Sequence, residues 1–163
     1  MVGNFHKFAK YRLKFLYFTK YLIKNMLSKK TRYAFRALTH LAENYGKGPV
    51  LICNISEQKN IPLKFLENIL NELKKANMLE SKKGKGGGYY LKVSPKKINL
   101  ATVIRVINGP IALLPCVSLN FYEKCADCDE KHCGMRKMMT ITRDATLKIL
   151  EKKTLQDILV AGT

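Results

Sequence analysis

A run of glycines between two short stretches of strand-forming residues most constrains how this chain can fold. Each glycine costs about 1 kcal/mol relative to alanine inside a helix, so Gly84-Lys-Gly-Gly-Gly88 marks a turn. The flanking residues 78–83 and 89–93 have the length and composition of strands and predict a β-hairpin. The Gly-Lys-Ser/Thr pattern of a nucleotide-cradling loop does not follow the glycines. The hairpin tip carries Lys82, Lys83 and Lys85.

Three helices are predicted before the hairpin. In residues 28–45 apolar side chains recur at spacings of three and four, with Ser28 as the N-cap. Asn54-Ile-Ser-Glu57 has the spacing of a capping box, which places the start of a second helix there and its end near Asn60. Pro62 is suited to the first position of the third helix. The apolar positions of the first and third helices are Ala34, Leu38, Leu41 and Tyr45, and Leu63, Leu66, Ile69, Leu70 and Leu73.

Three helices followed by a basic hairpin are typical of a winged helix-turn-helix, whose third helix enters the major groove of DNA. The chain carries a net charge of +18, which favours a polyanionic partner. Residues 1–25, 26–98 and 99–163 contribute +6, +10 and +2, so most of the excess precedes residue 99. Lys29, Lys30 and Arg32 crowd the first turn of a helix, where the dipole disfavours cations, and this also indicates an anion-binding role.

Residues 1–25 form a basic, aromatic segment without acidic residues. Two interpretations are open: a surface helix that lies on membrane or nucleic acid, and an extension that is disordered or precedes a true start at Met26. The segment lacks the roughly 20 apolar residues needed to span a bilayer, and it lacks the apolar core of a secretory signal. With the second interpretation, these features predict a cytoplasmic protein without membrane contact, whose reduced cysteines are suited to bind metal.

Four of the five cysteines lie within eighteen positions in the nearly neutral C-terminal third. Cys116, Cys125, Cys128 and Cys133 are separated by eight, two and four residues. Thiolates at such spacings suit an iron–sulfur cluster, whereas structural zinc usually takes two close pairs and finds only Cys125 and Cys128 here. A cluster, a zinc ion and a redox disulfide are therefore all open. Cys53, which follows an apolar stretch, is predicted to be buried.

Helices flank this cysteine segment on both sides. Residues 99–108 predict a short amphipathic helix ended by Gly109-Pro110, and a longer helix is predicted from Met135 onward. Residues 155–160 add a final short helix. The longer helix suits pairing with a second copy of the chain, or packing on its own core. Its repeat consists of Met135, Met138, Thr142, Ala145 and Ile149.

Four motifs occur in order before the cysteines and the long helix. They are Lys30-Thr-Arg-Tyr-Ala34, Ile55-Ser-Glu57, Leu66-Glu67 with Leu73, and Gly84-Lys-Gly-Gly-Gly-Tyr89. Together they resemble the IscR/NsrR/RirA/CymR family of bacterial winged-helix regulators. The resemblance implies a homodimer on a palindromic operator of double-stranded DNA. By position it also implies DNA contacts: Lys64, Glu67 and Asn68 in the major groove, Lys83 and Gly84 in the wing beside Lys85, and Ser28, Lys29 and Arg32 near phosphates.

The sequence therefore predicts a mainly α-helical, DNA-binding transcriptional regulator with a small β-hairpin wing and a long C-terminal dimerisation helix. Its regions are an extension at 1–25, the winged helix-turn-helix at 26–98, and the cysteine segment with the dimerisation helix at 99–163. The resemblance implies that Cys116, Cys125 and Cys133, with Cys128 as a fourth, bind a 2Fe–2S or 4Fe–4S cluster that senses iron–sulfur status, redox state or nitric oxide. Alternatives are a zinc or disulfide element in the same regulator, and a small iron–sulfur electron carrier. No motif pairs a nucleophile with a base, so no enzyme is predicted.

Overall fold

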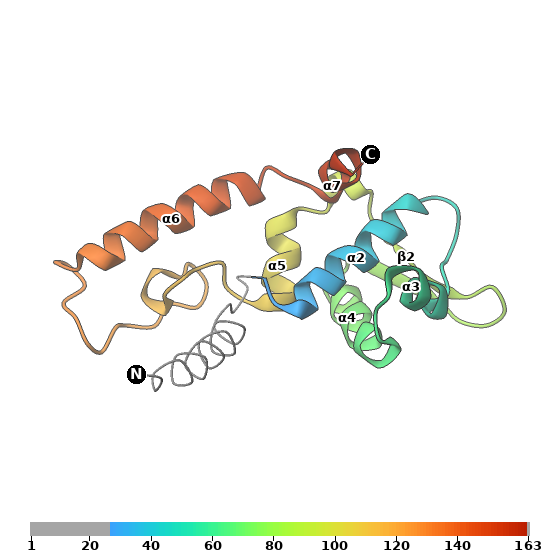
Figure 1. Ribbon diagram of the computed structural model, residues 1–163, viewed down its shortest axis with the longest axis horizontal. Coiled ribbons are helices and arrows are strands. Elements are labelled where there is room, and N and C mark those ends of the chain that lie inside the picture. The colour runs from blue at the N-terminus through green and yellow to red at the C-terminus, as the bar shows by residue number, and fades with distance from the viewer. Residues whose placement is uncertain (1–26, 163) are drawn as a thin grey trace, which may run out of the picture.

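A three-helix unit and a hairpin form the first part of the fold, and a long helix with its flanking segments forms the second (Figure 1). The computed structural model describes residues 27–162, and the predicted extension at 1–25 lies outside them. The elements are α2 Lys29–Glu43, α3 Ile52–Lys59, α4 Leu63–Lys75, β1 Leu79–Lys82, β2 Gly88–Leu91, η1 Pro95–Lys97, α5 Leu100–Asn108, η2 Pro115–Val117, α6 Gly134–Leu150 and α7 Leu155–Ala161. The predicted fold class, mainly α-helical with a small antiparallel hairpin, is confirmed.

The core is built from the apolar faces of α2 and α4, which pack against each other and against α5. Burying a leucine or isoleucine side chain contributes about 1.5–3 kcal/mol, so these two faces fix α4 firmly against α2. The predicted residues that are buried to 1% exposure or less are Ala34, Leu38 and Leu41 of α2, and Leu66, Ile69, Leu70 and Leu73 of α4.

Three side chains predicted to face the core are exposed instead. Tyr45 lies beyond the end of α2 at Glu43, and Leu63 is the first residue of α4, so neither reaches the packed face of its helix. Cys53 is exposed because it lies on the outer side of α3, whose buried residue is Ile55.

The start of α3 differs from the prediction, while its end agrees with it. The helix begins at Ile52, and Asn54 does not cap it. Val50 is held in an antiparallel bridge to Tyr89 of β2, and the chain turns into the helix directly after that bridge. The predicted end at Asn60 is confirmed, since this residue is left-handed with φ 48°.

The other helix starts follow the capping rule more closely. Ser28 caps α2 as predicted, because its Oγ accepts the Thr31 N–H at 3.1 Å. Asn99 caps α5 in the same way, with its Oδ1 accepting the Thr102 N–H at 3.2 Å. α4 begins one residue later than predicted, so Pro62 is its N-cap residue and not its first helical residue.

The wing is a two-stranded antiparallel sheet that is tied to the helices by one bridge. Its register runs from Leu79 opposite Leu91 to Lys82 opposite Gly88. The bridge between Val50 and Tyr89 adds two N–H···O bonds of 2.9 Å. These bonds attach the root of the wing to the segment between α2 and α3.

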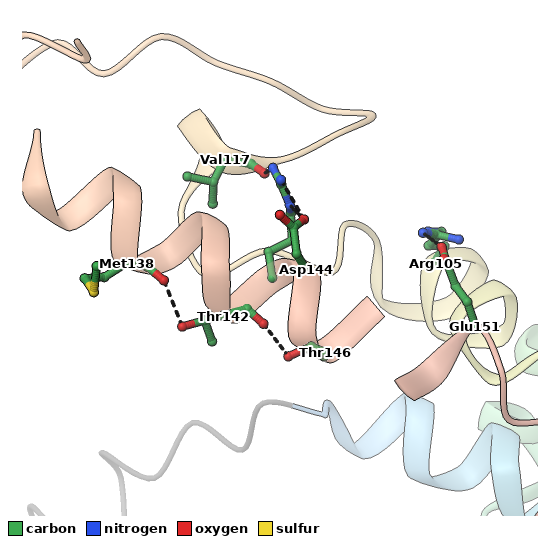
Figure 2. Close-up of polar contacts among 8 residues, drawn as sticks. Arg105, Val117, Met138, Thr142, Asp144, Thr146 and Glu151 are labelled. Carbon is green, nitrogen blue, oxygen red and sulfur yellow. Dashed lines mark hydrogen bonds and ion pairs between the residues drawn. The ribbon is translucent and has the colours of Figure 1, made fainter. Parts of the chain in front are cut away.

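The long helix α6 extends away from α2–α4, and η2 contacts it along its side (Figure 1). Leu147 is the buried residue of α6. At the end of α6, Glu151 pairs with Arg105 of α5 at 2.7 Å (Figure 2). α7 then returns to α2 and buries Leu155 completely. α6 is therefore fixed to the rest of the fold at its C-terminal end. None of the helices in residues 27–162 has the length and apolar character to cross a membrane.

The capping box of α7 makes this helix sensitive to acid. Asp157 accepts a 2.7 Å bond from the Thr154 hydroxyl and a 2.8 Å bond from the Thr154 N–H, and these lower the pKa of its carboxyl from 3.8 to about 2. Because the folded-state pKa is the lower one, the stabilisation is present above about pH 4 and is lost as the pH falls toward 2. We expect the Tm of the wild type to fall more steeply than that of Asp157→Asn over this range, in melts followed by circular dichroism. Parallel Tm curves would contradict this role of the capping box.

Candidate DNA interface and cysteine segment

The exposed face of α4 carries the three residues predicted to read bases. Lys64 has a 92% exposed side chain, and its Nζ lies 3.7 Å from Glu67 Oε2. Asn68, one helical turn after Lys64, is also exposed. Since the opposite face of α4 supplies the buried core, these polar side chains point away from the body of the protein. Lysine and asparagine can pair with guanine and adenine edges in the major groove.

The start of α2 is joined to α4 by an ion pair and an aromatic contact. Lys30 Nζ lies 2.7 Å and 2.6 Å from the two carboxylate oxygens of Glu72. The rings of Tyr33 and Phe65 meet edge to face with their centroids 5.7 Å apart. The ion pair is partly exposed and contributes at most about 1 kcal/mol, so its main effect is to orient α4.

The residues predicted to lie near phosphates are placed at this same helix start. Lys29 and Arg32 are exposed, and Lys29 Nζ lies 5.6 Å from the centre of the Tyr33 ring. Ser28 is half-buried, and its hydroxyl is engaged in capping α2. Of the three basic residues in this turn, Lys30 is engaged within the protein, while Lys29 and Arg32 present their charges to solvent.

The tip of the wing presents its lysines to solvent on a tight turn. Gly84, also exposed, adopts φ +87°, a conformation that other residues rarely take. Lys74, near the C-terminal end of α4, donates a 2.6 Å bond to Ser81 Oγ of β1 and so joins α4 to the wing. The exposed lysines at the tip of the wing are Lys82, Lys83 and Lys85.

Three of the four thiols of the cysteine segment lie near one another. Interaction with Cys125 and Cys133 raises the pKa of the Cys128 thiol to about 12. Cys133 is the N-cap of α6, and the Arg136 N–H, 3.4 Å from its Sγ, is the main cause that lowers the pKa of Cys133. The fourth thiol belongs to Cys116, which is buried in η2.

Two arginines of α6 hold the backbone around Cys116. Arg136 Nε donates to the Cys116 carbonyl at 3.4 Å, and Arg143 donates to the Val117 carbonyl. The Arg143 guanidinium also pairs with Asp144 at 2.7 Å. The segment that contains Cys116 is therefore fastened to α6 through its main chain, independently of the other three thiols.

Glu130 braces the other part of the segment. Its Oε2 accepts the Tyr122 hydroxyl at 2.7 Å, and its Oε1 accepts the Cys125 N–H at 3.2 Å. The bond from Tyr122 is the main cause that lowers the pKa of Glu130, so the carboxylate stays charged and holds Cys125 in place. His132, a further metal-ligand candidate by residue type, is exposed and lies 2.6 Å from Asp129 through its Nδ1.

The donor chemistry of the segment suits a thiolate-bound group, but its geometry is not that of a closed metal site. Thiols are the donors that iron–sulfur clusters and structural zinc use. Within residues 27–162, no three Cys, His, Asp or Glu side chains are arranged to hold a metal ion. A four-cysteine site therefore requires Cys116 and the other thiols to come together, whereas a disulfide between Cys128 and a neighbouring thiol involves only two of them.

Cys128 and Cys133 are expected to differ in reactivity in metal-free protein. A cysteine reacts as its thiolate, and a pKa of about 12 leaves Cys128 with about 1,000-fold less thiolate at neutral pH than an ordinary thiol of pKa 9. The lowered pKa of Cys133 has the opposite effect. Iodoacetamide should therefore modify Cys133 first and Cys128 last, as followed by peptide mass spectrometry between pH 6 and 9. Equal rates at the two positions would contradict the opposite pKa shifts of the two thiols.

The face of α6 that carries the predicted seam is exposed. Met135, Met138 and Ile149 have exposed fractions of 61%, 55% and 64%, and Ile141 beside them reaches 61%. Thr142 and Ala145 are exposed as well, so the interpretation that this seam packs on the chain's own core is wrong. Contiguous apolar surface of this kind usually marks an interaction site.

The sequence analysis missed the residues that position the site. Lys30, Glu130, Arg136 and Arg143 all act through partners that no periodic pattern or spacing motif signals. Cys133 was predicted as a ligand, but its role as the N-cap of α6 was not, since cysteine is not among the residues that usually cap helices.

Comparisons with known proteins place the chain among transcriptional regulators. The family model described as "Rrf2: Iron-dependent Transcriptional regulator" matches residues 27–161. A protein of Rhodobacter capsulatus described as an rrf2-like HTH-type transcriptional regulator is 37% identical, over 84% of this chain and 94% of that protein. The solved structure of CymR (YrzC), the global cysteine regulator of B. subtilis, is 30% identical with a TM-score of 0.69, over 84% of this chain and 97% of that chain. The solved structure of T. potens IscR is 26% identical with a TM-score of 0.67, over 84% and 88% of the two chains.

Proposed function

Because the chain belongs to the Rrf2 family of transcriptional regulators, we propose that it reads a double-stranded DNA operator with α4 and the wing. Its relatives are transcriptional regulators and not enzymes, as the sequence predicts. The observation that carries the proposal is that α4 and the wing, joined by the bond from Lys74 to Ser81, both carry exposed lysines. In this arrangement Lys64, Glu67 and Asn68 face the major groove, the wing lysines lie beside the minor groove, and Lys29 and Arg32 lie near phosphates. Such a protein acts where the chromosome is, which fits the predicted cytoplasmic location.

The second part of the proposal is a homodimer that forms through α6 and binds a palindromic operator. The exposed apolar residues of α6 supply a face that a second copy can cover. Two copies related by a two-fold axis present two α4 helices to half-sites about one DNA turn, or 34–36 Å, apart. A change in the angle between the two α6 helices would alter the distance between the two α4 helices. DNA binding would then depend on the conformation of the dimer.

The third part of the proposal is that Cys116, Cys125, Cys128 and Cys133 hold an iron–sulfur cluster. The proximity of Cys128 to Cys125 and Cys133 supports it, and the cysteine density matches the ligand type. When bound, a cluster would supply a group whose stability depends on iron supply, oxidants and nitric oxide. This chain's own residues then transmit its state: Arg136 and Arg143 join the backbone at Cys116 to α6, so a movement of the segment reaches the dimer helix.

A metal-free thiol switch in the same regulator is the second candidate. The observation that favours it is that Cys128 and Cys133 lie near each other, so a disulfide between them does not involve Cys116. In that reaction one hydrogen peroxide molecule is reduced to two water molecules, while the two thiols lose two protons and two electrons and form one S–S bond. A zinc ion on the same thiols is a further outcome.

Anaerobic purification followed by iron, acid-labile sulfide and zinc analysis distinguishes these candidates. We expect iron and sulfide in equimolar amounts in the wild type, and their loss in Cys128→Ser. Cys53→Ser, which alters an exposed thiol on α3, is the matched control and should keep both. If the protein contains stoichiometric zinc and no sulfide, the thiols bind zinc and not a cluster. Metal-free protein that forms a Cys128–Cys133 disulfide with peroxide would establish the thiol switch, and a protein with sulfide but no DNA binding would be an electron carrier.

A further inference from the structure

We propose that Asn108 is the positioning residue that couples the cysteine segment to the DNA-facing start of α2. The inference rests on the proposed function, because it concerns how the regulator passes the state of its thiols to its DNA surface. Asn108 is the last residue of α5 and is exposed. Gly109 and Pro110 follow it directly and begin the segment that leads to Cys116. The Asn108 side chain therefore stands at the junction between the two halves of the protein.

The Asn108 side chain contacts two donors at the start of α2. Its Oδ1 lies 3.4 Å from Ser28 N and 3.3 Å from Thr31 Oγ1. Both donors belong to the cap of α2, since Ser28 Oγ accepts the Thr31 N–H at 3.1 Å and lies 3.0 Å from Thr31 Oγ1. Thr31 is completely buried, so its hydroxyl depends on partners within the protein. Loss of the Asn108 carbonyl leaves this cap one acceptor short.

The cap in turn positions two parts of the DNA-facing surface. Lys29 and Arg32, the exposed cations proposed to lie near phosphates, are in the turn that Ser28 caps. Lys30, in the same turn, binds both carboxylate oxygens of Glu72 and so anchors α4. A shift of the cap therefore moves the phosphate-facing cations and the anchor of the recognition helix together.

The start of the cysteine segment meets α6 across a groove and not by close packing. The groove has a volume of about 410 Å³, and it is lined on different sides by Leu27, Asn108, Ile111, Leu113 and Arg143. It thus brings together the residue before the α2 cap, the end of α5, the segment and α6. When the segment rearranges, a displacement of Gly109 moves Asn108, which precedes it in the chain. The hydrogen bonds of Asn108 then transmit this movement to Ser28 and Thr31.

The coupling is measured as the ratio of two DNA affinities. All variants carry Cys53→Ser, which removes the exposed thiol of α3. The Kd for a duplex selected from random sequences by the parent protein is measured for anaerobically purified protein and for protein stripped with a chelator and oxidised with diamide. We expect a parent ratio within the range of about 5- to 150-fold that is typical of allosteric coupling. The ratio should fall below about 2-fold in Asn108→Ala, as the link between the two regions is then missing.

Two further variants separate coupling from folding. Asn108→Asp keeps an acceptor for both donors, so it should retain the parent ratio even though its added charge weakens DNA binding in both states. Asn44→Ala is the matched control, because Asn44 donates to the His40 carbonyl at 2.9 Å at the other end of α2, and it should leave the ratio unchanged.

Amide hydrogen exchange of residues 28–32 distinguishes coupling from a purely structural role of Asn108. A purely structural role would not make the exchange rates depend on the thiol state. Exchange there should depend on the thiol state in the parent protein and become independent of it in Asn108→Ala. An Asn108→Ala variant with the parent ratio and state-dependent exchange overturns the coupling while leaving the proposed sensing intact. A parent ratio of one overturns the sensing itself, and the coupling with it.

Discussion

Replacing Gly88 with alanine is expected to separate the wing from the helical unit. A Cβ at this position would lie 2.3 Å from Val50 O and 2.9 Å from Leu51 N, and these are backbone atoms that cannot swing aside. The φ of +147° adds strain for any residue other than glycine. To relieve this steric clash, the bridge between Val50 and Tyr89 must break, and its two hydrogen bonds are then lost. We expect the free energy of unfolding to fall by about 2–5 kcal/mol, measured by urea denaturation, with a parallel loss of DNA affinity.

Gly84→Ala is the matched control for this prediction. Gly84 is also left-handed, with φ +87°, but an added Cβ would find open space. Its replacement therefore introduces backbone strain alone, which costs about 1–2 kcal/mol. The difference between the two variants isolates the contact with Val50. Equal losses of stability would show that the bridge does not hold the wing.

The periodic patterns of the sequence predicted which faces are buried, because periodicity reports directly on the core. The stripe from Leu66 to Leu73 in α4 and the hairpin around the glycines both followed from local sequence. The start of α3 did not, although Asn54 and Glu57 have the spacing of a capping box. The bridge from Val50 to Tyr89, a contact between distant parts of the chain, sets where that helix begins, and tertiary structure overrides the local signal.

The basic first turn of α2 is a second place where a tertiary contact decides what local sequence cannot predict. Three cations at a helix start suggested anion binding for all of them, and composition could not separate their roles. In the folded chain Lys30 is committed to Glu72, and this pairing orients α4, while Lys29 and Arg32 stay exposed. Lys30, which the sequence suggested as a contact to an anion, instead positions α4 and so the proposed DNA contacts of that helix.

The spacing of the cysteines in the sequence did not predict which thiols lie near one another in the cysteine segment. The three-cysteine order implied by the family resemblance consists of Cys116, Cys125 and Cys133, with Cys128 as a fourth. In the structure Cys125 and Cys133 act on the Cys128 thiol and raise its pKa, whereas Cys116 is buried in η2 and its carbonyl accepts a bond from Arg136 Nε. Such contacts depend on how α6 lies against η2, which the linear spacing does not encode. The ligand set itself remains a prediction for the metal analysis.

Removing the charges of the wing tip is expected to cause the largest fall in DNA affinity. Each lysine that contacts a phosphate releases counterions and contributes about 0.9 to the slope of log K against log salt. Exchanging Lys82, Lys83 and Lys85 together for glutamine should therefore lower the magnitude of that slope by about 2.7 and weaken binding by roughly 500-fold near 0.1 M salt. Fluorescence anisotropy titrations over a range of salt concentrations measure both quantities.

The matched control exchanges three other exposed lysines for glutamine: Lys137, Lys148 and Lys152, in and directly after α6. α6 and the wing lie at opposite ends of the molecule in Figure 1. Both triple variants lower the net charge by three, so long-range attraction falls by a similar amount in each and only direct phosphate contacts distinguish them. Equal slopes for the two variants would show that the wing does not touch the backbone of DNA. Because counterion release does not depend on sequence, the comparison works on any duplex and tests the DNA surface independently of what the cysteines bind.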